Sequence, residues 1–558
     1  MMLLRHHRPD DLVAFGDGGP RTASELRRDA AKLAASLPEA RPGSHVLLVF
    51  ESDRYAFAVA LLAAWARGHA VMLPPDDRPQ TIGTLLQHAD VATLVHDTRA
   101  GGYPTVDELL ASEAGLPADA HAPSLGLATV FSAQLEHAHR KSSAQLLAEI
   151  DAVAELLEPS PGERILVDVP PNHLFGLVYG VLLPLQYGAA FSRAISPSAE
   201  AVIAGIEAHQ TPVWVSVPHR LQLCAAAGER LRALRRVLCG VRPLPPATAR
   251  ALCSDHTTVI ELLGSTETGG IAWRTAGADA PWQSLPGVET TVDDRGRLLV
   301  DSAFLSNDVP RPYPTAERAR PHPNGGFEHL GHADELVEVD GRSVELPALR
   351  EWLLSRPELL DAEVQHVWAP EGVTLLVAIV GSRCEPDTLR RALLERFDLG
   401  DLPCRMQQVE QLERDRLGGV ERTLLLRTFG LAADGRPLAT RIELVPSDAD
   451  LDEERVTAVA RVPSSYVHFE GHFDGYPILA AVVQLHELLL PLARRARPEL
   501  GELTSLQQLK FLGRISPGDE ITVVLRFPPD TDACDFEISK GDRRCSAGRL
   551  CFAGREVA

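Results

Sequence analysis

The sequence lacks the marks of a membrane or secreted protein. No stretch approaches twenty apolar residues, and the opening residues Met1 to Pro9 contain no apolar signal-peptide core. The eight cysteines are scattered, without a Cys-x-x-Cys pair or a ligand-like spacing with histidine. These absences predict a cytoplasmic protein with reduced thiols, no integral membrane segment and no bound metal.

Positive charge is also scarce. Lys and Arg number 55 against 76 Asp and Glu, and this formal net charge of −21 disfavours nucleic acid as a partner. A group of basic residues near the C-terminus could still receive an acidic protein or a phosphate group, or could be ordinary solvated surface charge. Its members are Arg494, Arg495, Arg497, Lys510, Arg514, Arg543 and Arg544.

Alternating strands and helices are expected over residues 1–330. A length of 558 residues predicts three to four domains. Apolar strands at Val46–Phe50, Arg164–Val169 and Val213–Val217 alternate with helical stretches such as Tyr55–Gly68. Because these strands read as buried on both faces, an α/β architecture is predicted.

The segment from Tyr466 to Glu487 carries the clearest chemistry. Gly471 and Gly475 permit a sharp turn at His472, and Pro477 suits the first turn of a helix, which predicts a helix from near residue 477. Its first N–H groups, around Ala480 and Ala481, could donate to an acyl carbonyl oxygen. The His472 imidazole could then take a proton from the neighbouring carbon.

This segment resembles the hot-dog fold dehydratases that act on 3-hydroxyacyl chains carried on acyl carrier protein, most closely the aryl-polyene type. In that family a Gly-His-Phe-Pro-Gly-x-Pro segment precedes an Asp or Glu fourteen residues after the histidine. The matching residues are His472, Phe473, Gly475, Pro477 and Val482–Leu485, with further similarity at Leu509–Asp519 and Cys545–Phe552.

The resemblance implies an α+β hot-dog domain over residues 438–558. It implies that His472 takes the α-proton and that the N–H of Ala481 stabilises the enolate-like oxygen. It also implies a homodimer through this domain and an acyl carrier protein bearing a 3-hydroxyacyl chain as partner. No cofactor is implied for dehydration beyond the carrier's phosphopantetheine arm.

Four positions depart from the family pattern, the first being Asp474, which replaces a proline. Ala480 and Ala481 replace a Pro-Gly pair, and the acidic position fourteen residues after His472 holds His486, followed by Glu487. A one-residue step along an α-helix turns a side chain by about 100°, so Glu487 is not a simple substitute. Either His486 donates the proton, or dehydration is impaired; His486 as an ordinary core histidine is an open alternative.

A second motif lies at Gly264-Ser-Thr-Glu-Thr-Gly-Gly270, where hydroxyls, a carboxylate and glycines follow an apolar strand. It resembles the signature of acyl- and aryl-adenylate-forming ligases, and the similarity extends over residues 10 to about 430. This resemblance implies an α/β ligase fold over 1–330 and a small α+β lid over 331–433. Thr266, Glu267 and Asp334 would then belong to a nucleotide site, with Glu267 near Mg²⁺.

The groups that handle phosphate in that family are missing. Ser132–Ser142 contains no glycine and carries Glu136, Glu317 replaces a ribose-binding aspartate, His332 replaces an arginine, and Gly419 stands where a lysine is expected. Four such losses on the ATP side predict that ATP and Mg²⁺ are not used and that no acyl-adenylate is made.

The two resemblances together imply a multidomain protein: a degenerate ligase-like region fused to a 3-hydroxyacyl-carrier-protein dehydratase, in polyene pigment or related fatty acid and polyketide synthesis. Three alternatives stay open. They are a non-catalytic acyl-carrier-binding scaffold, an active acyl ligase with altered ATP contacts, and a hot-dog thioesterase.

Overall fold

The computed structural model describes most of the chain. The described residues are 3–98, 103–111, 126–131, 138–195, 197–276, 280–339, 342–369, 372–381, 385–400, 402–415, 418–432, 436–446, 454–469, 478–529 and 531–553. Two compact units are present: residues 1–364, 379–385 and 409–420 form the first, and residues 365–378, 386–408 and 421–558 form the second. Among the described helices, none has the length and apolarity needed to span a bilayer.

The first unit contains a large sheet in the order β14-β13-β12-β11-β10-β8-β9-β1-β2. Strands β8 to β12 pair in parallel, as the buried apolar runs predict. The strands are β1 (Leu12–Phe15), β2 (Arg21–Thr22), β8 (Arg164–Val167), β9 (Ala190–Ser192), β10 (Val213–Ser216), β11 (Arg236–Cys239), β12 (Thr258–Ser265), β13 (Gly269–Thr275) and β14 (Gln283–Ser284).

The connections of this sheet are mainly helical. They include a π-helical turn, η1, in the middle of a buried helix. The elements are α5 (Ser143–Leu157), α6 (Leu174–Leu177), η1 (Val178–Leu182), α7 (Leu183–Tyr187), α8 (Ala199–His209), α9 (Pro218–Cys224), η2 (Ala225–Leu231) and α10 (Pro246–Leu252).

A second sheet of the same unit runs β5-β3-β4-β6-β7. Helix α2 (Arg54–Arg67) is capped by Asp53, whose side chain accepts from the Tyr55 N–H, and is buried along nearly its whole length because it is rich in alanine. The other elements are α1 (Ala23–Ser36), β3 (His45–Val49), β4 (Ala70–Leu73), α3 (Pro79–Leu86), β5 (Val91–His96), α4 (Val106–Ala111), β6 (Ala128–Phe131) and β7 (Ala138–Lys141).

Smaller elements follow along the chain. The first is a four-stranded sheet of β15 (Val288–Val292), β16 (Arg297–Ser302), β17 (Tyr313–Pro321) and β18 (Phe327–His332). The turn η3 (Ala333–Glu335), the paired strands β19 (Leu336–Val339) and β20 (Arg342–Glu345), and helix α11 (Leu346–Leu354) come next. The last is a sheet of β21 (Leu359–Ala369), β22 (Gly372–Gly381) and β23 (Cys404–Gln408), with helices α12 (Pro386–Arg396) and α13 (Arg422–Thr428).

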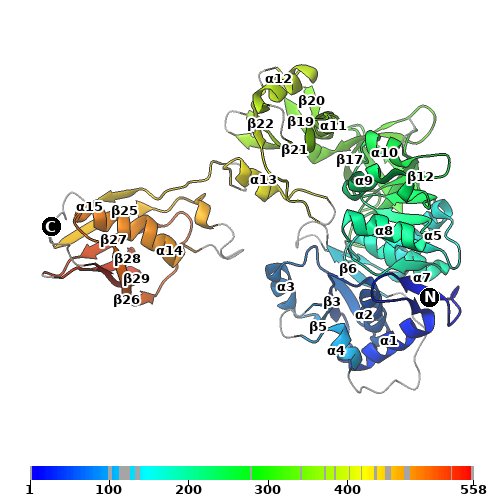
Figure 1. Cartoon of the computed structure of the whole chain (residues 1–558), viewed down its shortest axis with the longest axis horizontal. Coiled ribbons are helices and arrows are strands. Elements are labelled where there is room, and N and C mark those ends of the chain that lie inside the picture. Colours follow the sequence, from blue (N-terminus) through cyan, green and yellow to red (C-terminus); the bar gives the residue numbers. More distant parts are fainter. Residues whose placement is uncertain are drawn as a thin grey trace. The chain divides into compact units, whose positions relative to one another are not determined.

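The C-terminal part is an antiparallel sheet in the order β24-β25-β27-β28-β29-β26, with one long helix lying across it (Figure 1). Apolar side chains of the helix and of the inner sheet face form one core. The elements are β24 (Leu444–Pro446), β25 (Arg455–Arg461), η4 (Val467–Phe469), α14 (Ala481–Val483), η5 (Gln484–Leu489), α15 (Leu490–Ala496), β26 (Leu503–Phe511), β27 (Glu520–Arg526), β28 (Ala533–Lys540) and β29 (Arg543–Phe552).

This architecture fits the predicted hot-dog domain, but the expected start of the helix near residue 477 is wrong. The helix begins at Ala481, after the extended residue Ala480 (φ −58°, ψ 148°). The Leu479 N–H donates to the carbonyl of Ile515, in the segment between β26 and β27, at 2.9 Å. From Gln484 to Leu489 the helix is a π-helix, whereas the 100° step from His486 to Glu487 assumes a regular α-helix.

Candidate functional site

The ligase-like signature forms the turn between β12 and β13. Ser265 and Thr268 bond to each other across this turn, and Thr266 is buried. The Glu267 carboxylate lies 3.4 Å from the Tyr313 hydroxyl and 3.9 Å from His139 Nε2. His139 Nδ1 is in turn 3.5 Å from Asp308, so the imidazole stands between two carboxylates.

A fully buried lysine lies beneath this turn. The Lys141 ammonium donates to the carbonyls of Glu267 (2.9 Å) and Phe304 (2.8 Å). Burial lowers the pKa of Lys141 to about 8, although the carboxylates of Glu149, Glu267 and Asp308 act in the opposite direction. Sequence reasoning missed His139 and Lys141; the basic run that follows the glycine-free Ser132–His137 stretch was the available signal.

The expected ribose position is already engaged. Glu317 Oε2 and His329 Nε2 are 2.6 Å apart, and both side chains are mostly buried. Asp334 falls in η3, and its side chain lies outside the described part of the structure. Of the expected phosphate-loop position, Ser132–Ser142, residues 132–137 lie outside the described residues, residues 138–141 form β7, and Ser142 caps α5.

Gly419, at the expected lysine position, belongs to a tight hairpin. Its N–H donates to Asp415 Oδ1 at 2.7 Å, and an added Cβ would lie 2.7 Å from Asp415 Oδ2 and 3.2 Å from Arg242 Nη2. Arg242 follows Val241, a β-branched residue at φ 76°, a conformation that costs free energy. The Asp415 carboxylate and the Arg242 guanidinium therefore both lie close to where a side chain at 419 would begin.

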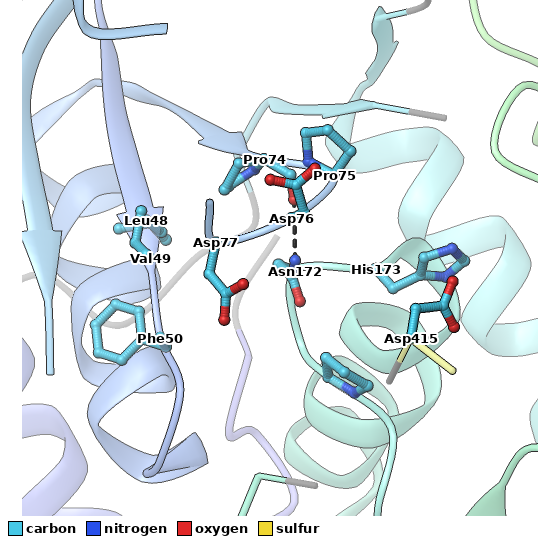
Figure 2. A pocket seen from close by; sticks show the side chains of 11 residues that line it. Leu48, Val49, Phe50, Pro74, Pro75, Asp76, Asp77, Asn172, His173 and Asp415 are labelled. Carbon is cyan, nitrogen blue, oxygen red and sulfur yellow. Dashed lines mark hydrogen bonds between the residues drawn. The ribbon is translucent and has the colours of Figure 1, made fainter. Parts of the chain in front are cut away.

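A cavity of about 190 Å³ opens near the carboxyl ends of β3, β4 and β8, next to this hairpin (Figure 2). The His173 ring lies beside the Asp415 carboxylate, and burial lowers the pKa of His173 to about 4 despite that neighbour. Carboxylates face the cavity, and no lysine or arginine belongs to the described lining. The lining residues are Leu48, Val49, Phe50, Pro74, Pro75, Asp76, Asp77, Pro170, Asn172, His173 and Asp415.

The dehydratase-like site is described only in part, because His472 lies among residues 470–477, outside the described residues. The other predicted residues fall on one helix: Ala481 at its exposed start, His486 exposed and Glu487 half-buried in the π-helical turn. π-Helical turns occur frequently at functional sites.

Tyr466 is a residue of this region that sequence reasoning did not single out. Its side chain is fully buried, and its hydroxyl has no hydrogen-bond partner among the described residues. Burial raises the pKa of Tyr466 to about 12, and the negative charge of Glu487 adds to this shift. Glu487 is therefore near enough to the phenol to act on its ionisation.

Two segments of the chain match known protein families. Residues 132–303 match AMP-binding enzymes, and residues 448–549 match the ApeI-like family, described as ApeI dehydratase. The chain joins an AMP-binding domain to an ApeI-like dehydratase domain. The predicted fusion of these two resemblances is confirmed. The domain boundaries at 330, 433 and 438 stay predictions.

Curated relatives of the AMP-binding part are ligases. A 4-coumarate–CoA ligase of Cereibacter sphaeroides is 30% identical over 235 residues, which cover 40% of this chain and 52% of that protein. An L-proline–[L-prolyl-carrier protein] ligase of Pseudomonas fluorescens is 26% identical over 322 residues, covering 51% and 64%. The matched stretches thus span between half and two thirds of these relatives.

Solved structures confirm the ligase fold. O-succinylbenzoate coenzyme A synthetase from Bacillus subtilis, in complex with ATP and magnesium ion, has a TM-score of 0.64 at 16% identity, and the match covers 75% of this chain and 97% of that one. At this identity the similarity establishes the fold of the AMP-binding part. It does not establish its activity.

Proposed function

We propose that the protein dehydrates a 3-hydroxyacyl thioester, carried on acyl carrier protein, to the trans-2-enoyl thioester. The observation that carries this proposal is the ApeI-like dehydratase match over 448–549, on a sheet that packs around a helix bearing His486 and Glu487. The proposed setting is a cytoplasmic polyene pigment pathway of the aryl-polyene or xanthomonadin-like kind, or related fatty acid synthesis.

The proposed reaction needs a base, a donor to the carbonyl oxygen and a proton donor to the leaving hydroxyl. His472 takes the proton from the carbon next to the thioester carbonyl, and the electron pair moves through the enolate-like state to form the C=C bond. The N–H of Ala481, with that of Ala480, stabilises the negative oxygen of that state. The C–O bond at the 3-position breaks, and the hydroxyl leaves as water after receiving a proton from His486 or Glu487.

The burial of the two donors favours Glu487. Glu487 is half-buried near Tyr466, so the domain encloses this side chain more than it encloses His486. The His486 side chain is exposed to solvent in the single chain. A second copy of the chain could bring it into an enclosed site.

The edge strand β26 supports a homodimer. Most of its residues are exposed, including Leu506, Leu509 and Phe511, the last with 55% of its surface accessible. An exposed, apolar edge strand presents unpaired N–H and C=O groups with which a strand of another chain can pair. The carrier protein would meet the basic surface of the same domain, where Arg494, Arg495 and Lys510 are exposed.

The AMP-binding domain, in this proposal, does not make an acyl-adenylate. Glu267 and Glu317 already contact His139 and His329, and the cavity beside Asp415 presents carboxylates that would repel a triphosphate. These contacts fit a nucleotide with Mg²⁺ poorly. The domain would keep a binding or scaffold role for the acyl chain.

Intact mass spectrometry tests the proposal. Purified protein is incubated with 3-hydroxyacyl-carrier protein, and the loss of one water is followed for the wild type, His472→Ala and His486→Ala. Loss of water with the wild type but not with His472→Ala is expected. If no sample loses water, the dehydratase proposal fails and a non-catalytic carrier-binding scaffold replaces it; free thiol release would indicate a thioesterase.

An active ligase is the second candidate, favoured by the ligase relatives of the AMP-binding domain. Pyrophosphate release with MgATP and an aromatic or fatty acid would establish it. Absence of release, together with water loss in the mass assay, would leave dehydration as the activity of the chain.

A further inference from the structure

We infer that Gln484 and Ser546 form a buried pair that holds the helix start in the orientation needed for catalysis. Neither residue contacts substrate in this inference; both are positioning residues. The inference rests on the proposed dehydration, and it adds the means by which the N–H groups of Ala480 and Ala481 are aimed.

The pair links the last strand to the first helical turn. The Ser546 hydroxyl on β29 donates to Gln484 Oε1 at 2.7 Å. Gln484 Nε2 then donates to the carbonyl of Leu479 at 2.8 Å. Gln484 and Ser546 are only 6% and 1% exposed, so water cannot substitute for either bond.

The Leu479 backbone is therefore held at both ends, since its N–H donates to Ile515 and its carbonyl accepts from Gln484. The Leu479 carbonyl and the Ala480 N–H belong to one trans peptide and point in opposite directions. Because the carbonyl points into the core, the Ala480 N–H points away from it. No described residue accepts a hydrogen bond from this N–H.

The next N–H, that of Ala481, is also available. Ala480 is the residue before the helix, and its carbonyl accepts the Gln484 N–H at 3.0 Å. Ala481 then occupies the first helical position, where the N–H has no helical acceptor. Gln484 thus fixes the helix start through its side chain and its backbone, and two successive donors are left for an acyl oxygen.

Two variants test the pair in the full-length protein. Gln484→Leu and Ser546→Ala are each expected to lower kcat by about 10- to 100-fold with little change in KM, because displaced oxyanion donors are felt in the transition state. Ser546→Thr keeps the hydroxyl and is expected to restore most of kcat. Thr457→Val is the matched control, since Thr457 is a buried hydroxyl of β25 without a described partner.

A merely structural role gives a different result. If Gln484→Leu and Ser546→Ala lower the melting temperature but leave kcat equal to that of Thr457→Val, the positioning role is overturned. A wild type that removes no water would instead defeat the proposed function on which the pair depends.

Hydrogen exchange gives a readout without turnover. An enoyl-pantetheine probe is expected to slow amide exchange of the peptide covering residues 478–483 in the wild type and in Thr457→Val, but not in Ser546→Ala. Equal slowing in all three proteins would overturn the positioning role even if the enzyme assay showed no activity.

Discussion

Polar groups differ in their partners between the nucleotide-like site of the AMP-binding domain and the region around the helix start of the dehydratase-like domain. In the first, Glu267 lies against Tyr313 and His139, and Glu317 is bonded to His329. In the second, the Ala480 N–H and the Tyr466 hydroxyl have no partner among the described residues.

This difference bears on what each site can bind. A polar group already satisfied within the protein must break that contact before it can serve a ligand, and the exchange yields little net free energy. A donor that is fixed by its surroundings but unpaired can stabilise developing charge without reorganisation. The contrast favours chemistry at the helix start over chemistry at the nucleotide-like site.

The largest expected effect is the loss of the proposed base. His472→Ala is expected to lower the dehydration rate by about 10²- to 10⁴-fold, the usual contribution of a general base. His468→Ala, at a histidine of the nearby turn η4, serves as the matched control. Equal dehydration rates for both variants in the intact-mass assay would contradict the conclusion that the dehydratase-like site carries the chemistry.

A smaller effect is expected to separate the two candidate donors. Glu487→Gln keeps the size of the side chain but cannot donate a carboxyl proton, and it is expected to cost about 10²-fold or more in rate. His486→Gln is expected to cost less, because the His486 side chain is exposed. Initial rates of enoyl product formation compare the two.

The reverse order would assign the donor to His486 and would require a neighbouring copy to enclose it. Sedimentation of the same samples measures whether the wild type is a dimer. A monomeric wild type with the larger loss in His486→Gln would contradict both the dimer and the role of Glu487.

Both family resemblances, and the α/β and hot-dog architectures, could be inferred from the sequence, because buried apolar strands and glycine-rich signatures are local patterns. It could not predict the π-helical turn at Gln484–Leu489, since residue spacing alone assumes a regular α-helix. The pairing of Gln484 with Ser546 was equally hidden, because it joins residues 62 positions apart. The contacts of His139 and Lys141 could not be predicted for the same reason, because their partners lie in the segment from β12 to β18, far along the chain.

The comparison also predicts that the missing lysine cannot simply be restored. Gly419→Lys places a Cβ 2.7 Å from Asp415 Oδ2, so no pyrophosphate release and a stability loss of about 1–3 kcal/mol are expected. Gly83→Lys, at a glycine of α3 with open space around it, is the control for glycine replacement. Pyrophosphate release with MgATP and an aromatic or fatty acid measures the activity, and thermal melting measures the stability.

Activity in Gly419→Lys would mean that one residue separates the domain from adenylation. The internally satisfied contacts of Glu267 and Glu317 would then be compatible with a nucleotide. The AMP-binding domain would have lost a single group rather than its site.

The last expected effect concerns the pH dependence of stability set by Lys141. Its pKa is lowered from 10.5 to about 8 by burial, so between these pH values the unfolded chain binds more protons than the folded chain. Stability from this group therefore rises as pH increases from about 8 to 10.5, by roughly 3 kcal/mol at most.

Lys141→Met removes the rise, whereas Lys32→Met, at a partly exposed lysine of α1, keeps it. Calorimetric melting at several pH values between 8 and 10 measures the slope; equal slopes in both variants would show that Lys141 is not the buried cation beneath the signature turn.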